Sequence, residues 1–268
     1  MNEALGLGLL QGLTEFLPVS SSGHLGLARI ILGMGAPSLE FDLVLHVATL
    51  FAVLIYFSRD LLSLLLEWVC GFFNGHARAW AGWRFGWAII VGVFVTAPIA
   101  IFLKKHFVES ASENLLWLGG NLWITAILLF SSKLIREGGG TVRIRDGLFV
   151  GLLQGIAAMP GISRSGSTIW AGLLTGLSRE EAFKFSFLLS APTILGATLY
   201  DAREIGGSDA FFRSLPDGWL QGAIVSFIVG MLSLACLRKL IVSDRWWLFA
   251  VYCMSIGSIS VIVHFTGA

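Results

Sequence analysis

Six long apolar stretches are the feature that most constrains how this chain can fold. Each is long and apolar enough to cross the hydrocarbon core of a bilayer, which takes about 20 residues of helix, and none contains lysine or arginine. The chain is 56% hydrophobic and 13% charged, whereas soluble domains are about 25% charged. The sequence therefore predicts an all-α integral membrane protein, with spans at residues 41–57, 87–103, 115–131, 185–200, 219–237 and 246–263.

Composition also argues against several other classes of protein. The three cysteines, Cys70, Cys236 and Cys253, are few and widely spaced, so they indicate neither a disulfide framework nor a metal cluster. The net charge is +1, and no basic stripe with interleaved aromatic residues is present. A nucleic-acid partner is therefore not expected, and the bilayer itself is the expected surroundings.

The chain contains an internal repeat. GLLQG at residues 8–12 recurs at 151–155, an offset of 143, and at the same offset the pattern Ser-x-Ser-Gly begins at Ser20 and again at Ser163. Ahead of the first span in each half lie two short apolar pieces, separated by Pro, Gly and Ser. Each piece is too short to span, and such a loop is tolerated at membrane depth only when protein or a wet cavity surrounds it. We therefore predict a re-entrant helical hairpin in each half, at residues 4–32 and 148–177.

The repeat predicts how the two halves are placed in the membrane. Each half, 1–140 and 141–268, has one hairpin and three spans, and because three is odd the halves must be inverted within a single membrane domain. The hairpins then enter from opposite faces, and their tips meet near the midplane, as in inverted-repeat transporters. Lysine and arginine are more numerous on one side of this topology, so the positive-inside rule makes that side cytoplasmic and puts both termini outside.

The predicted tips carry polar residues that are costly inside a membrane. The first tip reads QGLTEFLPVSSSGH over residues 11–24, and the second reads PGISRSGST over residues 160–168. An ionisable side chain at membrane depth costs at least roughly 2.5 kcal/mol, so a functional reason is expected for Glu15, His24 and Arg164. A Glu15–Arg164 ion pair that only fastens the halves together is the structural alternative, and it does not explain the serines.

This combination of groups favours phosphate chemistry. A Ser-rich turn that opens onto a helix offers N–H and O–H groups to an anion, and helices are expected to begin at Leu25 and Ile169. Arg164 can bind two phosphate oxygens at once. A serine hydroxyl can attack, His24 can act as acid or base, and Glu15 can act as base or hold a divalent cation.

Other polar residues in the predicted spans are interpreted as packing groups. His46 lies at helical spacing from Asp42 and is more simply explained as an interhelical polar residue than as one that touches substrate. Asn121 and Thr125 are interpreted as helix-packing residues.

At its two tips the sequence resembles the undecaprenyl pyrophosphate phosphatase family of the bacitracin-resistance type. Residues 11–24 match the first family motif, residues 160–168 match the second, Pro-Gly-x-Ser-Arg-Ser-x-x-Thr, and the collinearity extends over nearly the whole chain. The resemblance implies an enzyme of the bacterial inner membrane, with its active site facing the periplasm. Such an enzyme hydrolyses C55 isoprenyl pyrophosphate to the monophosphate and inorganic phosphate, recycles the carrier lipid for peptidoglycan synthesis and gives bacitracin resistance.

The resemblance also implies roles for individual residues. Catalytic residues would be Glu15, Ser21, His24 and Arg164, with Ser21 as the favoured nucleophile and Ser20 or a water molecule as its rivals. Phosphate would be bound by Gln11, Ser20, Ser22, Ser163, Ser165 and Thr168. A divalent cation, Mg or Ca, is implied, and Glu15 is its expected ligand. Gln11 stands where many relatives have a first Glu and cannot ionise, which weakens the case for a cation held by two carboxylates.

Two other functions fit the same pattern. Inverted repeats with paired hairpins also make transporters, so a flippase for a phosphorylated lipid is the main alternative. A non-catalytic receptor for a lipid pyrophosphate is another. Transport alone gives no role to Ser21 beside His24 and Glu15. The sequence is compatible with a homodimer as well as with a monomer.

Overall fold

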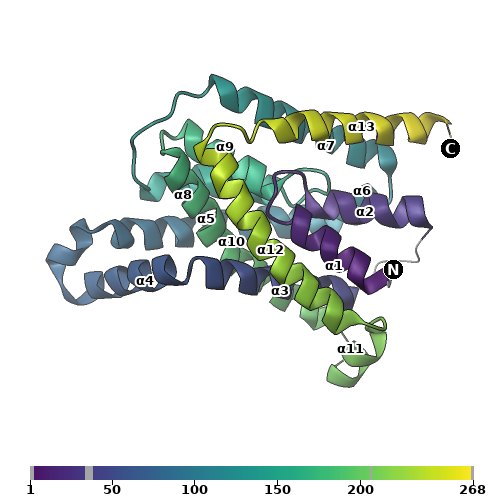
Figure 1. Ribbon diagram of the computed structural model, residues 1–268. Coiled ribbons are helices and arrows are strands. Elements are labelled where there is room, and N and C mark those ends of the chain that lie inside the picture. The colour runs from purple at the N-terminus through teal and green to yellow at the C-terminus, as the bar shows by residue number, and fades with distance from the viewer. Residues whose placement is uncertain (1–2, 34–38, 206, 267–268) are drawn as a thin grey trace.

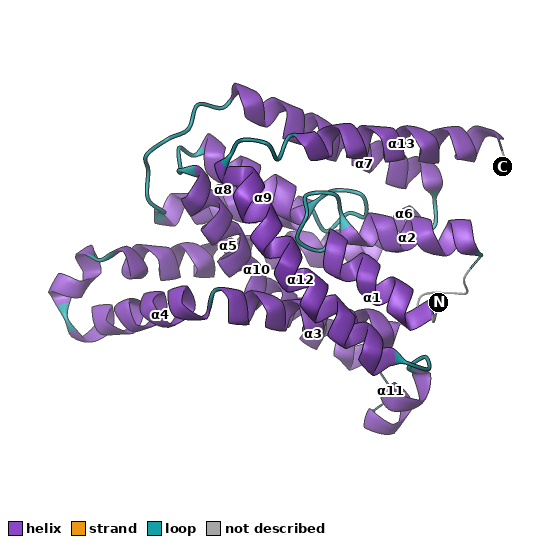
Figure 2. Ribbon diagram, viewed as in Figure 1, coloured by secondary structure: helices purple, strands orange, loops and turns teal. Residues whose placement is uncertain are grey.

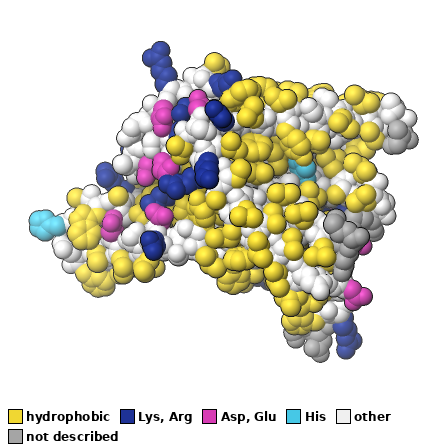
Figure 3. All heavy atoms as spheres, viewed as in Figure 1, with side chains coloured by type: hydrophobic (Ala, Val, Ile, Leu, Met, Phe, Trp, Pro, Cys, Tyr) yellow, Lys and Arg dark blue, Asp and Glu magenta, His cyan; other side chains and the backbone are white. Residues whose placement is uncertain are grey.

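The computed structural model describes residues 3–33, 39–205 and 207–266, and these residues form an all-helical protein (Figures 1 and 2). Within these ranges, β-type pairing is limited to one bridge between Gly140 and Leu177. Six helices are long and apolar enough to cross a membrane. Figure 3 shows hydrophobic side chains over much of the visible face, with most of the charged side chains on its left part and a few at its lower right end. The chain is therefore a multi-pass membrane protein.

The six long helices correspond to the six predicted spans. Helix α7 has the predicted bounds, whereas α5 and α10 begin earlier than predicted because hydropathy marks only the apolar part of a helix. The start of α10 is fixed by Ser178, whose side chain accepts the Glu181 N–H at 3.2 Å. The six helices are α3 (Leu39–Tyr56), α5 (Ala81–Leu103), α7 (Leu115–Ser131), α10 (Arg179–Asp201), α12 (Trp219–Val242) and α13 (Leu248–Thr266).

Two pairs of shorter helices precede α3 and α10. Helices α1 (Glu3–Thr14) and α2 (Ser21–Leu32) are joined by a first loop, residues 15–20. Helices α8 (Ile144–Ile156) and α9 (Arg164–Leu174) are joined by a second loop, residues 157–163. These four helices are shorter than the roughly 20 residues that a span requires.

The second helix of each pair starts before the position expected from hydropathy. The expected starts at Leu25 and Ile169 are wrong, because serine caps extend both helices toward their loops. Ser20 Oγ accepts the Gly23 N–H at 3.3 Å, and Ser163 Oγ accepts the Gly166 N–H at 3.1 Å. The polar residues that follow each cap therefore lie in the first turns of α2 and α9 rather than in the loops.

The repeated GLLQG motif brings helices of the two halves into close contact. Helix α1 packs on α12, and α8 packs on α5. A Cβ atom on Gly8 would lie 2.2 Å from the Gly222 carbonyl oxygen, and one on Gly151 would lie 2.6 Å from the Gly92 carbonyl oxygen. Small residues allow membrane helices to approach this closely without a hydrophobic driving force. The first glycine of each copy of the motif is therefore explained by packing.

The remaining segments lie outside this central arrangement. Helix α4 (Ser58–Phe73) packs against α5, to which it is linked through η1 (Gly75–Ala79). Helix α5 continues into a π-helical segment, η2 (Lys104–Val108), and a short α6 (Glu109–Ser112). Short helices η3 (Ser132–Leu134), η4 (Ala202–Glu204) and α11 (Ser208–Ser214) complete the chain. The start of α1 and the end of α13 lie on the same side of Figure 1.

The close helix contacts predict an unusual response to alanine. In a helix, Gly→Ala normally stabilises by about 1 kcal/mol. At Gly8 and Gly151 we expect the opposite, since overpacking costs about 1–3 kcal/mol. Gly8→Ala and Gly151→Ala should each lower the thermal unfolding temperature of the purified protein in detergent. Gly120 on α7 is the control, because a Cβ there meets no atom within 4 Å. If Gly120→Ala lowered the melting temperature as much as Gly151→Ala, this account of the packing would be wrong.

Candidate active site

The two loops meet at one place, and each contributes to the other's structure. The Gly161 N–H of the second loop donates to Ser20 Oγ of the first loop at 3.0 Å. An Arg164 guanidinium N–H donates to Glu15 Oε1 at 2.5 Å. A single site is thus built from residues far apart in the sequence.

Glu15 is the centre of this site. Its side chain is only 5% exposed, yet both carboxylate oxygens have partners. Oε1 pairs with Arg164, while Oε2 accepts the Ser21 hydroxyl at 2.6 Å and the Gln11 side-chain amide at 3.0 Å. The Nε2 atom of His46 lies 3.9 Å from Oε2. The burial of this carboxylate is tolerated because its charge is paired and its oxygens accept hydrogen bonds.

Ser20 and Ser21 are adjacent in sequence but have different surroundings. Ser20 Oγ accepts the Gly23 N–H in the first turn of α2 and the Gly161 N–H of the second loop, and Ser20 has a φ of 70°. That left-handed conformation is uncommon for serine and persists only where its surroundings hold it. Ser21 Oγ instead donates its proton to Glu15. The structure thus gives Ser20 the environment of a structural cap and Ser21 that of a hydroxyl beside a base.

The second loop is held by α7. Asn121 Nδ2 donates to the Pro160 carbonyl at 2.7 Å. Thr125 Oγ1 donates to the Gly161 carbonyl at 2.8 Å and accepts the Ser163 N–H at 2.9 Å. These three bonds satisfy backbone groups that no helix ladder reaches, as a buried loop requires. The two α7 residues therefore support the site, a role that their interpretation as general packing residues missed.

His24 lies apart from Ser21 and Glu15 in its hydrogen bonding. Its Nδ1 atom contacts the Ser20 carbonyl at 2.8 Å, and its Nε2 atom contacts the Tyr252 hydroxyl at 2.9 Å. The imidazole also stacks on the Tyr252 ring, with centroids 5.5 Å apart. Both ring nitrogens are therefore engaged with groups that fasten α2 to its own cap and to α13.

Ser165 and Thr168 are buried behind the site. Ser165 Oγ lies 3.3 Å from Ser163 Oγ. Thr168 Oγ1 lies 2.6 Å from Ser186 Oγ and 2.8 Å from the Arg164 carbonyl oxygen. Of the phosphate-binding residues expected in the second tip, Ser163 faces the cavity described next, and these two do not.

A polar pocket of about 410 Å³ opens above the two loops. Ser21, Ser22 and Arg164 line it, together with Glu15 and Ser163. Residues that the sequence did not single out as site residues also line it: Asp42 and His46 from α3, Gln154 from α8, Lys104 from η2 and Asp201 from α10. A signal for Gln154 was available, since it is the counterpart of Gln11 in the repeated GLLQG motif.

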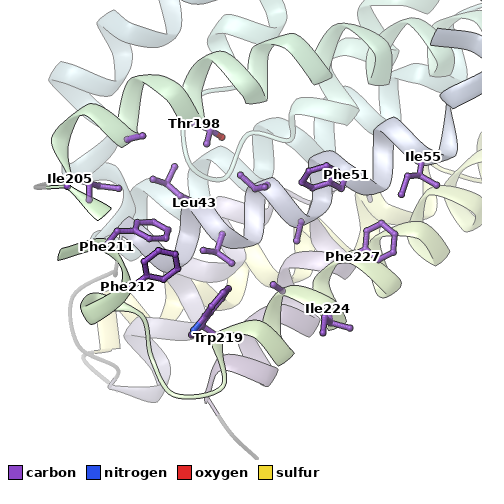
Figure 4. A pocket seen from close by; sticks show the side chains of 16 residues that line it. Leu43, Phe51, Ile55, Thr198, Ile205, Phe211, Phe212, Trp219, Ile224 and Phe227 are labelled. Atoms are coloured by element: carbon purple, nitrogen blue, oxygen red, sulfur yellow. The ribbon is translucent and has the colours of Figure 1, made fainter. Parts of the chain in front are cut away.

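An apolar groove of about 890 Å³ adjoins the polar pocket. Helices α3, α10, α11 and α12 form it (Figure 4), with Phe51, Ile55 and Phe227 at one end and Phe211, Phe212 and Trp219 at the other. Leu43 and Thr198 line both the groove and the pocket. The two cavities are therefore neighbours that share part of their lining, and together they match a ligand with a polar head and a long apolar tail.

Comparison with known proteins identifies the family. Residues 4–259 match the family model of the bacitracin resistance protein BacA. The chain belongs to the BacA family. Three relatives, each named undecaprenyl-diphosphatase, come from Syntrophotalea carbinolica, Desulforapulum autotrophicum and Methanosphaera stadtmanae. The first is 41% identical over 95% of each chain, and the other two are 39% identical over 97% of this chain and 96% of theirs. The predicted family resemblance is confirmed.

The BacA-family site fits a divalent cation that is held only partly by protein. Among the described residues, no group of three or more His, Cys, Asp or Glu side chains could hold a metal ion. Mg²⁺, however, is usually held by one or two carboxylates together with water and substrate phosphates. Glu15 provides a carboxylate, and the neighbouring Gln11 Oε1 is buried without a hydrogen-bond partner. Gln11 is fully buried and does not line the pocket, whereas Glu15 does, so Glu15 is the carboxylate that suits a cation completed by water and a phosphorylated ligand.

The anchoring of the second loop can be tested on α7. Thr125→Val would leave the Gly161 carbonyl and the Ser163 N–H without partners, and a buried unsatisfied group costs about 1–3 kcal/mol. We expect a clear fall in the thermal unfolding temperature in detergent. Thr49→Val is the matched control, since the Thr49 hydroxyl is buried too but bonds only carbonyls of its own helix. Equal melting temperatures for the two variants would show that Thr125 does not hold the loop.

Proposed function

We propose that this chain is an undecaprenyl-diphosphate phosphatase. It hydrolyses C55 isoprenyl pyrophosphate to the monophosphate and inorganic phosphate, and so recycles the carrier lipid for cell-wall synthesis and gives bacitracin resistance. The observation that carries this proposal is the junction of a polar pocket, holding Glu15, Ser21 and Arg164, with an apolar groove. Membership of the BacA family and the names of the relatives support it.

The proposed architecture is an inverted repeat of residues 1–140 and 141–268. In each half a re-entrant hairpin precedes three spans, and the hairpin tips are the two loops of the site. The packing of α1 on α12 and of α8 on α5 supports this arrangement, because the first helix of each hairpin then packs on the same span of the opposite half. Equivalent glycines of the repeated motif make both contacts.

The proposed location is the bacterial inner membrane, with the active site open to the periplasm and both termini outside. The excess of Lys and Arg on one side of the predicted topology supports this orientation. So does the position of the start of α1 and the end of α13 on one side of the molecule (Figure 1).

In the proposed reaction, Ser21 Oγ attacks the terminal phosphorus of the lipid pyrophosphate. Its proton passes to Glu15 Oε2, which already accepts it at 2.6 Å. The bond from Ser21 Oγ to phosphorus forms, the bond from phosphorus to the bridging oxygen breaks, and the lipid monophosphate leaves. Water then cleaves the phosphoserine and releases inorganic phosphate. Arg164 binds the oxygens on which negative charge spreads, after exchanging its Glu15 partner for phosphate.

His46 is the imidazole best placed to assist proton transfer. It lines the pocket and lies 3.9 Å from Glu15, whereas both nitrogens of His24 are engaged elsewhere. We therefore propose that His46 delivers a proton toward the leaving group, and that His24 positions Ser20 and α2. When bound, a divalent cation would neutralise part of the pyrophosphate charge, and Glu15 would hold it.

The proposed position of the isoprenyl tail is the apolar groove. A pocket of a few hundred to about 1,000 Å³ encloses a drug-sized ligand. This groove therefore holds the isoprene units nearest the phosphate, and the rest of the C55 chain stays in the bilayer. Leu43 and Thr198 line both cavities. With the tail in the groove, the phosphates would therefore lie in the pocket that Arg164 lines.

The catalytic assignment predicts separable effects of two neighbouring serines. Ser21→Ala should reduce phosphate release from undecaprenyl pyrophosphate at least about 100-fold, as should Arg164→Ala. Ser20→Ala should mainly lower the melting temperature, because it removes the acceptor of two backbone N–H groups. Retained turnover in a folded Ser21→Ala protein would favour direct attack by water. Lipid translocation in liposomes without any phosphate release by the wild type would favour a flippase instead.

The groove predicts a dependence on tail length. Ala48 lines the groove, and Ala48→Trp should fill part of it. We expect a higher KM for undecaprenyl pyrophosphate and little change for a pyrophosphate that carries a single isoprene unit. Ala97→Trp, at an exposed position of α5 outside both cavities, is the control. If Ala48→Trp changed the KM for both substrates equally, the tail would lie elsewhere.

A further inference from the structure

Lys104 faces the polar pocket at the end of α5. Thr96, Ala100 and Lys104 all line the pocket, and their spacing of four residues puts them on one face of the helix. Lys104 also begins the π-helical segment η2, which changes the direction of the side chains that follow. Such π-helical turns within α-helices are frequent at functional sites.

Each lysine or arginine that lines the pocket is paired with a carboxylate that also lines it. Arg164 and Lys104 are the two Lys or Arg residues among the described residues that line it. Arg164 pairs with Glu15, and Lys104 pairs with Asp201. Their exposure differs, since the Lys104 side chain is 37% exposed and that of Arg164 is 19% exposed. A pyrophosphate that enters the pocket must therefore take a cation from a carboxylate, and Lys104 is the more accessible one.

The Lys104–Asp201 pair lies where the pocket meets the groove. Asp201 lines the pocket, the next residue, Ala202, lines the groove, and Thr198, one turn earlier on α10, lines both. With the lipid tail in the groove, the first group beyond this junction is the phosphate attached to the tail. The terminal phosphate then lies deeper, toward Arg164 and Ser21.

We propose that Lys104 binds the lipid-proximal phosphate, the one that stays on the lipid after hydrolysis, and that Asp201 competes with this phosphate for the Lys104 ammonium. This inference rests on the proposed function and extends it to substrate recognition. A partly exposed ion pair is a weak stabiliser, so its exchange for a phosphate costs little. Lys104 thereby distinguishes a pyrophosphate on a lipid from inorganic phosphate, which reaches only Arg164.

The two members of the ion pair should have opposite effects on substrate binding. Lys104→Gln should raise the KM for undecaprenyl pyrophosphate about tenfold, the effect of losing one charged hydrogen bond. It should also lower kcat, because the phosphate that Lys104 binds is the leaving group and gains negative charge as the bond breaks. Asp201→Asn should lower the KM, since it removes the competitor. Lys104→Arg should keep a KM close to that of the wild type.

Product inhibition gives a second, independent measurement. Undecaprenyl phosphate retains the proximal phosphate, so Lys104→Gln should weaken inhibition by this lipid and leave inhibition by inorganic phosphate unchanged. Lys105→Gln is the matched control, because Lys105 is the neighbouring exposed lysine and does not line the pocket. The control should behave like the wild type in both measurements.

The outcomes separate this inference from the function on which it rests. Wild-type phosphate release is measured first on the same preparation, and its absence would remove the proposed function and this inference together. With an active wild type, KM changes of the same sign in Lys104→Gln and Asp201→Asn would show that the pair is only structural. A KM for Lys104→Gln equal to that of Lys105→Gln would show that Lys104 does not bind substrate.

Discussion

The ion pair between Glu15 and Arg164 is the interaction on which the rest of this structure depends. A carboxylate that is 5% exposed in a membrane protein cannot remain charged without a partner, and its partner comes from the opposite half of the chain. Neither loop can satisfy its own ionised group. The pairing of these two charges therefore requires the two halves of the chain to be in contact.

That closure requires backbone groups of both loops to be satisfied away from water. Helices satisfy their own ladders, but loops at membrane depth need side-chain partners. Ser20 accepts one N–H from α2 and one from the second loop, and Thr125 donates to one carbonyl of the second loop and accepts one of its N–H groups. The close contacts at Gly8 and Gly151 let the supporting helices come near enough for these bonds to form. Small residues thus allow the helices to approach closely, and hydroxyl groups form hydrogen bonds with the backbone groups of the loops.

Sequence reasoning predicted those parts of the protein that follow from local patterns. Long apolar runs fixed the six helices, with α7 predicted at its observed bounds, and the repeat pointed to the two loops that meet. The starts of α2 and α9 were missed because the first turn of each helix, after its serine cap, is polar, and hydropathy marks only apolar residues. Proximity along the chain favoured His24 as the partner of Glu15. In the structure, the Nε2 atom of His46 from α3 lies 3.9 Å from Glu15, whereas the Nε2 atom of His24 contacts Tyr252. Which face of α2 or α3 points to the carboxylate depends on helix rotation set by packing, and no local pattern encodes it.

The paired charges of the pocket bear on how such a site distinguishes its ligand. An unpaired cation buried in a membrane would be costly in the absence of substrate, so each cation of the pocket rests on a carboxylate. The free energy of ligand binding then depends on how much more strongly each cation interacts with a phosphate than with its carboxylate. It does not include the full attraction between the cation and the phosphate. A pyrophosphate, with more charge and more oxygens than one carboxylate, can displace both Glu15 and Asp201 at once. A ligand with a single phosphate can displace only one of them. In the proposed mode of binding, selectivity for the pyrophosphate therefore follows from the same pairing that stabilises these buried charges.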